Sequence, residues 1–506
     1  MPRDTSFAPQ PRAIVAGAGF GGIAAALRLK ARGYDVHLID RCPRLGGRAQ
    51  VFEHEGFRHD AGPTVLTAPF LIEELFTLFG KRMADYIELV EPDPWYRFHF
   101  HDGETFDYGP TEEATEAEIA RLSPRDVEGY RRMGAWSKKI YDIGFKRLST
   151  VPFHSVGFML KQIPHLLRLR SYESVWGMVA RFIKDDRLRR AFSIQPLLVG
   201  GNPFDTTAIY GMINHLERTH GIWFPKGGTG ALVDALEVLM REEGIQISLN
   251  TTIERIEVED GRATGVTLAG GRTLDTEIVV SNMDPVHVYR HMLTADLASP
   301  VARLRSKHGR LSMGLYVLFF GAKRTWPEVA HHTVWFGERY KSLLSDIFHK
   351  KVLAEDFSLY VHRPTATDPS FAPEGCDSFY VLCPVPNLAG GQDWSVEGPK
   401  LRDRIVKALD ETMLPGLSDH ITAEFAMTPE DFKSDYLSVD GAGFSLSPFF
   451  SQSAWFRFHN RAEGVDGLYF VGAGTHPGAG LPGVVSSAKV LDTLVPEAVS
   501  DAVMAE

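Results

Sequence analysis

The stretch Arg12-Ala-Ile-Val-Ala-Gly17-Ala-Gly19-Phe20-Gly21-Gly22-Ile-Ala-Ala-Ala26 decides the fold of this 506-residue chain. Its apolar run before Gly17 predicts a buried parallel strand, and the residues after Gly22 predict the start of a helix. Gly17, Gly19 and Gly22 have the G-x-G-x-x-G spacing. The first allows a tight turn, the second lets the backbone approach a pyrophosphate, and the third lets the helix pack against the strand. Free N–H groups at the helix N-terminus would then face the phosphates.

The residues that follow continue the same unit. The predicted helix from Ile23 to Arg32 ends at Gly33, and the run from Asp35 to Asp40 predicts a second strand. Asp40 comes 18 residues after Gly22, where an acid accepts hydrogen bonds from the ribose hydroxyls of an adenosine. An ordinary strand-turn-helix with surplus glycine is the alternative. The acid at this distance favours a dinucleotide site.

Composition narrows the class of protein. The chain is 44% hydrophobic and 23% charged, which is ordinary for a soluble globular protein, and its length predicts two or three domains. The net charge of −10 argues against nucleic acid as the main partner, although it leaves room for a local basic patch facing a membrane.

Targeting and redox signals are weak. Three cysteines are too few for a disulfide framework, so a reducing cytosol is expected. The first eleven residues lack the apolar core of a signal peptide, and no run of about 18 apolar residues predicts a membrane span. The most apolar stretch, Leu311 to Ala322, is predicted to be a buried strand.

Two glycine-containing loops follow the predicted βαβ unit. The loop from Arg41 to Gln50 contains Gly46, Gly47 and Arg48, and its arginine would offer a planar donor fork to a diphosphate. A solvated basic loop is an equally good interpretation of these residues alone. The second loop, Asp60-Ala-Gly62-Pro63-Thr64, predicts a tight turn that brings backbone close to a flat ligand, or else a plain Gly-Pro turn.

The middle of the chain contains an amphipathic segment near residues 155–170. Its apolar face is Val156, Met159, Leu160, Ile163, Leu166 and Leu167, and its polar face is Lys161, Gln162, His165 and Arg168. Pro164 predicts a kink or break. Such a basic amphipathic segment can lie on an anionic membrane, but the periodicity alone favours a helix packed on the core. The uncharged runs Ser193–Gly201 and Ile209–Leu216 would line an apolar cavity or form core.

Residues 300–440 predict strands, such as 314–320, 357–361 and 378–384, alternating with helices such as 400–413. Within this region His331 and His332 are adjacent. Neighbouring residues on a strand point to opposite faces, so we expect two unrelated histidines and predict no metal site. The sequence contains no convincing acid–base dyad or nucleophile triad, and no catalytic residue is predicted.

The C-terminal segment Leu468-Tyr-Phe-Val471-Gly472-Ala-Gly474-Thr475-His-Pro-Gly-Ala-Gly480-Leu-Pro-Gly483-Val484-Val-Ser-Ser-Ala488 predicts a strand, a glycine-rich loop and a helix. It resembles the carotenoid-desaturase signature. The glycine stretch, Asp40, Leu45–Arg48 and Asp60–Thr64 resemble, in this order and spacing, the FAD-binding half of the flavin amine oxidase superfamily. Together the motifs resemble the bacterial-type phytoene desaturases over nearly the whole chain.

The resemblance implies an α/β fold with three parts. These are a discontinuous Rossmann-like FAD-binding domain (12–75, 221–300 and 441–500), an inserted mixed β-sheet substrate domain (76–145 and 301–440) and a helical membrane-associating or substrate-entry region (146–220). It also implies the FAD-binding residues, with Ile253 at the adenine and the helix from about Gly483 aimed at the flavin. They are Gly17, Gly19, Phe20, Gly21, Gly22, Asp40, Arg41, Gly47, Arg48, Gly62, Pro63, Thr64, Ile253, Gly474, Thr475, Gly483 and Val484.

The function implied by the resemblance is FAD-dependent desaturation of phytoene, with hydride passing to the flavin and a proton leaving, in successive steps towards lycopene or neurosporene. A second G-x-G-x-x-G at 478–483 lacks a preceding strand, so no NAD(P) domain is expected and a quinone or oxygen would accept the electrons. Residues 62–64 and 482–484 would frame the isoalloxazine, while residues near 150–220 and 310–320 would line the hydrocarbon tunnel. The expected location is cytoplasmic and peripheral on a membrane surface, with a homo-oligomer there compatible with the resemblance.

Three alternatives stay open at this stage. A carotenoid isomerase or 3,4-desaturase would use the same cofactor on a related hydrocarbon. An amine oxidase is less well matched, because the His-Pro-Gly-Ala-Gly run does not suggest an aromatic cage. A prenyl-lipid carrier of the Rab-GDP-dissociation-inhibitor type would share the fold without needing the flavin.

Overall fold

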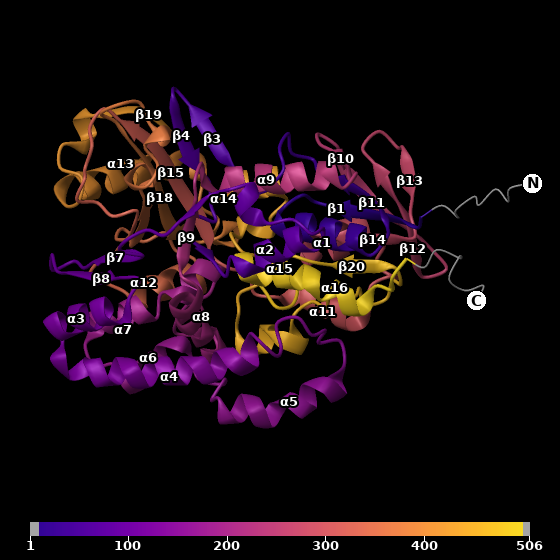
Figure 1. Ribbon diagram of the computed structural model, residues 1–506, viewed down its shortest axis with the longest axis horizontal. Coiled ribbons are helices and arrows are strands. Elements are labelled where there is room, and N and C mark those ends of the chain that lie inside the picture. Colours follow the sequence, from indigo (N-terminus) through magenta and orange to yellow (C-terminus); the bar gives the residue numbers. More distant parts are fainter. Residues whose placement is uncertain (1–9, 499–506) are drawn as a thin grey trace, which may run out of the picture.

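Five parallel strands form the sheet to which the glycine stretch belongs. The computed structural model describes residues 10–498 (Figure 1). The strands are β1 (Arg12–Ala16), β2 (Asp35–Ile39), β10 (Gln246–Ser248), β14 (Ile278–Ser281) and β20 (Leu468–Phe470), in the order β10-β2-β1-β14-β20. Because they come from three distant stretches of chain, the Rossmann-like part is discontinuous, as predicted.

Helices and a small second sheet surround this parallel sheet. Helix α1 (Phe20–Ala31) joins β1 to β2, and its buried alanines 24–26 let it pack closely among its neighbours. It contacts α15 (Leu481–Lys489) and α9 (Gly228–Glu242), so the two ends of the chain share one apolar core. The small second sheet is an antiparallel meander of β11 (Ile253–Glu259), β12 (Arg262–Leu268) and β13 (Thr273–Asp275).

The second large sheet is mixed and has the order β19-β15-β18-β17-β16-β7-β8. Its strands are β7 (Tyr96–His99), β8 (Thr105–Tyr108), β15 (Gly314–Ala322), β16 (His332–Trp335), β17 (Leu359–His362), β18 (Asp377–Val385) and β19 (Ile421–Met427). Strands β7 and β8 form an antiparallel hairpin around Asp102-Gly103. Strand β15 is buried along its whole length, so its apolar sequence is explained by packing inside the protein. No helix within residues 10–498 has both the length and the apolarity needed to cross a bilayer.

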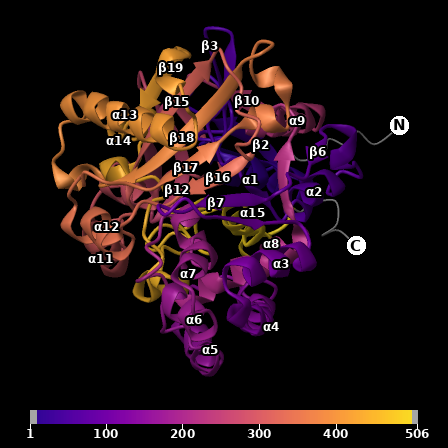
Figure 2. The same cartoon turned by 90° about the vertical axis from the view of Figure 1, so that its left-hand side faces the viewer.

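A layer of helices lies beside this mixed sheet (Figure 2). It consists of α3 (Glu112–Leu122), α4 (Val127–Gly144), α5 (Val156–Arg168), α6 (Val175–Phe182), α7 (Asp186–Phe192) and α8 (Met212–His220). Helix α4 packs against α6 and α8. The helical layer therefore includes α4, which precedes residue 146, the predicted start of the helical region. Helix α5 continues through Pro164 rather than breaking there, and it lies at the outer edge of the molecule (Figure 1).

The remaining elements are short connections or covers. Helix α13 (Trp394–Glu411) starts before residue 400, where the sequence predicted its start, and it covers the mixed sheet. The other remaining strands and helices are β3 (Val51–His54), β4 (Phe57–Asp60), β5 (Leu66–Thr67), β6 (Leu89–Val90), β9 (Ile222–Pro225), α2 (Phe70–Thr77), α10 (Pro285–His287), α11 (Pro300–His308), α12 (Lys341–Ser345), α14 (Pro429–Tyr436) and α16 (Leu491–Leu494).

Candidate functional site

The glycine turn forms a cradle that side chains would fill. A Cβ at Gly22 would lie 1.9 Å from the carbonyl oxygen of Gly17, which is far inside contact distance. Gly17 itself has φ +99°, which suits glycine. Among residues 10–498, no side chain caps the start of α1, whose N-cap is Gly19. The amide groups of its first turn, from Phe20 to Gly22, therefore remain available to an anion such as a diphosphate.

Asp40 lies at the carboxyl end of β2, beside this cradle. It is buried, and its two oxygens accept hydrogen bonds from the amides of Ala18, at 2.6 Å, and Cys42, at 2.7 Å. These bonds fix the carboxylate next to the glycine turn. Each oxygen keeps a further lone pair that can accept from a ribose hydroxyl.

The loop after Asp40 folds back onto the glycine turn. The amide of Gly46 donates to the carbonyl of Ala18 at 2.8 Å, and Gly47 has φ +59°. Arg48 donates to the carbonyl of Gly443, at 2.6 Å, and to the hydroxyl of Ser438, at 3.1 Å. These two bonds leave some of its five N–H groups for a diphosphate. Arg41 is exposed and donates to the Ser434 carbonyl at 2.7 Å.

The C-terminal loop approaches the same cradle from the other side. Asn282, at the end of β14, lies beneath both: a Cβ at Gly21 or at Gly472 would come within 2.5 Å of its Oδ1. Gly474 packs equally closely, with a built Cβ 2.3 Å from Pro285 Cδ. Asn282 was missed in the sequence because no motif marks it. Only the pairing of β14 with β1 and β20 brings it under the two loops.

A buried arginine holds this C-terminal loop in shape. Arg457 donates to four carbonyl oxygens, including those of Ala473, at 2.6 Å, and Thr475, at 3.2 Å. The hydroxyl of buried Thr475 donates to the Phe458 carbonyl at 2.8 Å. Val484 follows in α15, which begins at Leu481, two residues before the predicted start near Gly483. Ile253 starts β11 and is buried against the apolar core beside the sheet.

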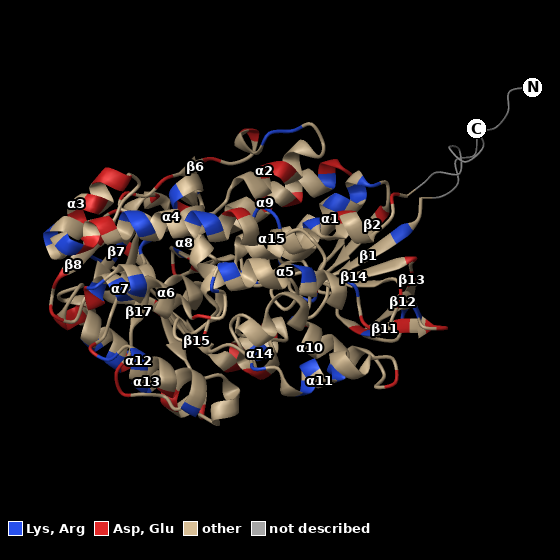
Figure 3. Ribbon diagram, turned by 90° about the horizontal axis from the view of Figure 1, so that it is seen from below, with Lys and Arg blue, Asp and Glu red and all other residues tan. Residues whose placement is uncertain are grey.

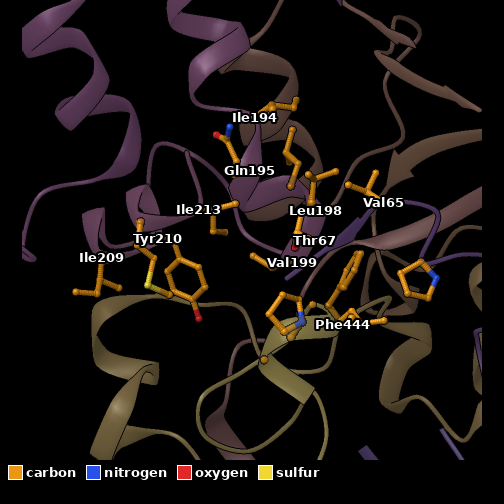
Figure 4. A pocket seen from close by; sticks show the side chains of 18 of the residues that line it. Val65, Thr67, Ile194, Gln195, Leu198, Val199, Ile209, Tyr210, Ile213 and Phe444 are labelled. Atoms are coloured by element: carbon orange, nitrogen blue, oxygen red, sulfur yellow. The ribbon is translucent and has the colours of Figure 1, made fainter. Parts of the chain in front are cut away.

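A cavity of about 310 Å³ lies between these loops, the mixed sheet and the helical layer. Its wall contains residues 62–64 and 480–483, and so includes Pro482 and Gly483 but not Val484 of the residues 482–484 that were predicted to frame the isoalloxazine. It also contains Met313 and Leu315 from β15 and its approach, and many apolar residues of 144–216. Figure 4 shows part of this wall, formed by Val65, Ile194, Leu198, Val199, Ile209, Ile213 and Phe444. The space suits an apolar ligand that reaches the predicted flavin end.

Glu217 is the unusual member of this wall. Of the cavity residues within 10–498, it alone carries a carboxyl group. It is 1% exposed, and the amide of Gln195 and the hydroxyl of Tyr96 each donate to it at 3.4 Å. Burial raises the pKa of Glu217 to about 7, so neutral and charged forms coexist near neutral pH. The sequence contained no signal for this residue beyond its position directly after the largely apolar run Ile209–Leu216.

The turn after Asp60 is anchored to the start of α9. Helix α9 begins at Gly228, and the amide of Thr229 donates to the buried carboxylate of Asp60 at 3.0 Å. The hydroxyl of Thr229 donates to the carbonyl of Pro63 at 3.0 Å. Asp60 thus fixes the 62–64 turn against α9. Thr64 also shares a hydrogen bond of 2.6 Å with the hydroxyl of Tyr360.

The expectation that His331 and His332 are unrelated is wrong. Strand β16 begins only at His332, so the alternation of faces does not extend to His331. The two imidazole rings lie 4.4 Å apart, and the ring of His362 lies 4.7 Å from His331 and 5.4 Å from His332.

Comparison with known proteins agrees with this site. A family model described as flavin containing amine oxidoreductase matches residues 20–490. The chain is 48% identical to a lycopene-forming phytoene desaturase of Pseudescherichia vulneris, over 96% of this chain and 99% of that one. It is 44% identical to a neurosporene-forming phytoene desaturase of Rhodobacter capsulatus, over 96% and 94%.

Among solved structures, a putrescine oxidase bound to putrescine superposes with a TM-score of 0.62 at 15% identity, over 96% of this chain and 99% of that one, which supports the fold. An FAD oxidoreductase is identified by the glycine cradle, by Asp40 fixed at the position of a ribose-binding acid, and by the matching family. The chain therefore belongs to the flavin-containing amine oxidoreductases and, within them, to the bacterial phytoene desaturase family.

Proposed function

We propose that this chain desaturates phytoene in successive steps towards lycopene or neurosporene. The observation that carries the proposal is the apolar cavity that joins the turns at 62–64 and 480–483 to the helical layer. The names of the relatives support the substrate and the two products. When bound, FAD supplies the acceptance of a hydride, which the side chains of this protein cannot provide.

The residues of the chain bind the cofactor, orient the substrate and exclude water from the reacting groups. The dinucleotide would be held by the turn at residues 17–22 together with Asp40, Arg48 and Asn282. The first turn of α1 would face its phosphates. The N-terminus of α15 would favour negative charge at the flavin end. The cavity wall excludes water and aligns a hydrocarbon chain by shape, because it offers few polar partners.

Glu217 is the candidate acceptor for the proton that leaves the substrate carbon. It touches the cavity, and its pKa of about 7 makes the carboxylate both available and basic at neutral pH. Burial raises the basicity of the carboxylate, while the hydrogen bonds from Gln195 and Tyr96 and the nearby charge of Arg218 favour its ionised form.

The test combines a spectrum with product analysis. We expect purified protein to carry a visible flavin spectrum that bleaches when phytoene in liposomes is added without oxygen and returns with a quinone or oxygen. The products should have fewer hydrogens than phytoene. A product of unchanged mass would indicate an isomerase, and colourless protein that takes up no FAD would leave a prenyl-lipid carrier. Either result contradicts the proposal.

We further propose that α5 lies on a membrane surface from which the substrate enters. Val156, Leu160, Ile163 and Leu167 form an apolar stripe whose members are 39–58% exposed. Basic residues flank the stripe (Figure 3). Met159 and Leu166, on the inner side of the same helix, belong to the cavity wall. We choose a bilayer as the partner of this stripe because the opposite side of the same helix lines the apolar cavity and the flanking basic residues suit anionic lipids.

This membrane proposal predicts that the double variant L160E/L167E loses binding to vesicles of phosphatidylcholine with phosphatidylglycerol, because two charges interrupt the apolar stripe. Co-sedimentation measures it. The matched control is V238E, which places a charge at another exposed valine on α9, 46% exposed and outside the stripe. The proposal fails if L160E/L167E sediments with vesicles as well as V238E does.

A further inference from the structure

Three histidines meet at the edge where β16 and β17 pair. His332 and His362 are directly opposite partners in these antiparallel strands, so their side chains share one face. His331 joins them from the residue before β16. One nitrogen of each imidazole lies within 4.8 Å of one nitrogen of each of the others. None of the three histidines lines the cavity, although Tyr360, which does, lies within hydrogen-bond distance of His332.

The cluster has unmet polar groups in a buried place. His331 is 4% exposed, and His332 and His362 are fully buried. Within residues 10–498, no hydrogen-bond partner reaches the Nε2 atoms of His331 and His332 or either ring nitrogen of His362. Leaving a buried polar group without a partner is energetically unfavourable, so a cluster of such groups indicates a ligand that satisfies several of them at once.

The other nitrogens of two rings are already engaged. His331 Nδ1 lies 2.6 Å from the hydroxyl of Thr367, and His332 Nδ1 lies 2.7 Å from the hydroxyl of Tyr360. When each Nδ1–H donates to its oxygen, the Nε2 lone pairs point out of the rings unused. This is the arrangement in which an outer oxygen orients a metal-ligating histidine.

Electrostatics agree with this geometry. Burial of all three imidazoles disfavours their charged forms. Neutral imidazole is the form that binds a metal ion. The nearby guanidinium of Arg363 is paired with Asp377 at 3.1 Å, and Asp60 is the acid that faces the cluster.

We propose that His331, His332 and His362 bind one divalent transition-metal ion, with zinc the best match to an all-imidazole set. Asp60 supplies the remaining ligand directly or through a water. Its Oδ2 lies 3.9 Å from His362 Nε2, and in the described part of the chain its buried Oδ1 has no partner. Tetrahedral zinc–nitrogen bonds of about 2.0–2.1 Å place the ligand nitrogens about 3.3 Å apart, so nitrogens that now lie within 4.8 Å of one another must approach by up to about 1.5 Å.

Such an ion would position the wall of the substrate cavity. It would tie β16 and β17 to Asp60, the residue that anchors the 62–64 turn. Through His332 it would also fix the Tyr360 hydroxyl, and through Tyr360 the hydroxyl of Thr64. The site is thus assigned a structural role at the flavin end of the cavity. The metal site itself does not depend on the proposed reaction.

The test measures metal in the full-length holoenzyme, purified without chelators and after removal of any histidine tag. Inductively coupled plasma mass spectrometry should find close to one zinc or other transition-metal ion per chain. H331Q and H362Q should lose it. Y360F, which removes only the outer hydroxyl, should weaken zinc binding about 10–100-fold by calorimetric titration of chelator-treated protein. H349Q, at a half-exposed histidine on the surface, is the matched control and should keep the metal.

Two results would overturn the proposal. One is a holoenzyme that carries no metal and whose chelator-treated form does not bind zinc in titration. The other is metal retained unchanged in H331Q and H362Q. If these variants fail to fold, the metal content and zinc titration of the unaltered protein still decide. A missing metal with an intact flavin spectrum rejects this site alone, whereas bound metal in colourless protein rejects only the proposed function.

Discussion

Replacing Glu217 with glutamine is expected to lower the turnover of phytoene about 10²–10⁴-fold, the usual contribution of a positioned proton acceptor. Glutamine has nearly the same shape and keeps a polar group beside Gln195 and Tyr96, but it cannot take up the proton. FAD binding should be unchanged, because Glu217 lies on α8 rather than among the residues at the glycine cradle. Initial rates with phytoene in liposomes, normalised to bound flavin, measure the effect.

The rate of the unaltered enzyme should depend on pH through the titration of Glu217. Because the carboxylate is the active form, the rate should rise with pH and reach half its limit near pH 7, following the pKa of about 7 that burial gives Glu217. The E217Q variant should lack this rise. E128Q, at a largely exposed position on α4, is the control and should keep both rate and profile.

Stability should move in the opposite direction to activity. The folded-state pKa of Glu217 is raised from the ordinary 4.5 to about 7, so the folded protein holds a proton that the unfolded chain releases. Its contribution to stability is present below pH 4.5 and is lost as pH rises towards 7. The E217Q variant avoids that loss, so above neutral pH its free energy of unfolding should exceed that of the unaltered protein by about a few kcal/mol. A variant with full activity, or one that loses activity only by unfolding, would remove Glu217 from the reaction.

Replacing Gly22 with valine is expected to abolish FAD binding and yield colourless protein. Even a single Cβ there would lie 1.9 Å from the Gly17 carbonyl oxygen, so the turn and the start of α1 must separate. That movement removes the first-turn amides from the diphosphate and costs packing in a fully buried place. Flavin absorbance per chain and the melting temperature measure the two effects.

The matched control is G134A. Gly134 lies inside α4, and a Cβ there would meet nothing within 4 Å. Alanine is a better helix former than glycine by about 1 kcal/mol, so this variant should keep its flavin and melt at the same or a higher temperature. Stoichiometric flavin in purified G22V would show that the cradle is not the FAD site. If G22V does not fold, D40N supplies a milder test, since it keeps the side-chain shape while weakening the acceptor for the ribose.

Much of the fold follows from local patterns that need no distant partner. The glycine spacing, the hairpin around Asp102-Gly103 and the meander of residues 253–275 are set by turn conformations and by short-range alternation. For the same reason β15 could be recognised as a buried strand from its apolar run. Pro164 was a weaker guide, because α5 accommodates the proline and continues to Arg168.

By itself the sequence determined a dinucleotide cradle and, through resemblance, the flavin family. Only the tertiary structure decided which side chains share a space. Glu217 is one acid among many until α8 brings it into an apolar cavity, and Asn282 is unremarked until the order of the parallel strands places it under two glycine loops. His331 was misjudged because the start of β16, one residue later, depends on pairing with β17. Burial and proximity arise from contacts between distant segments, and local sequence patterns do not specify those contacts.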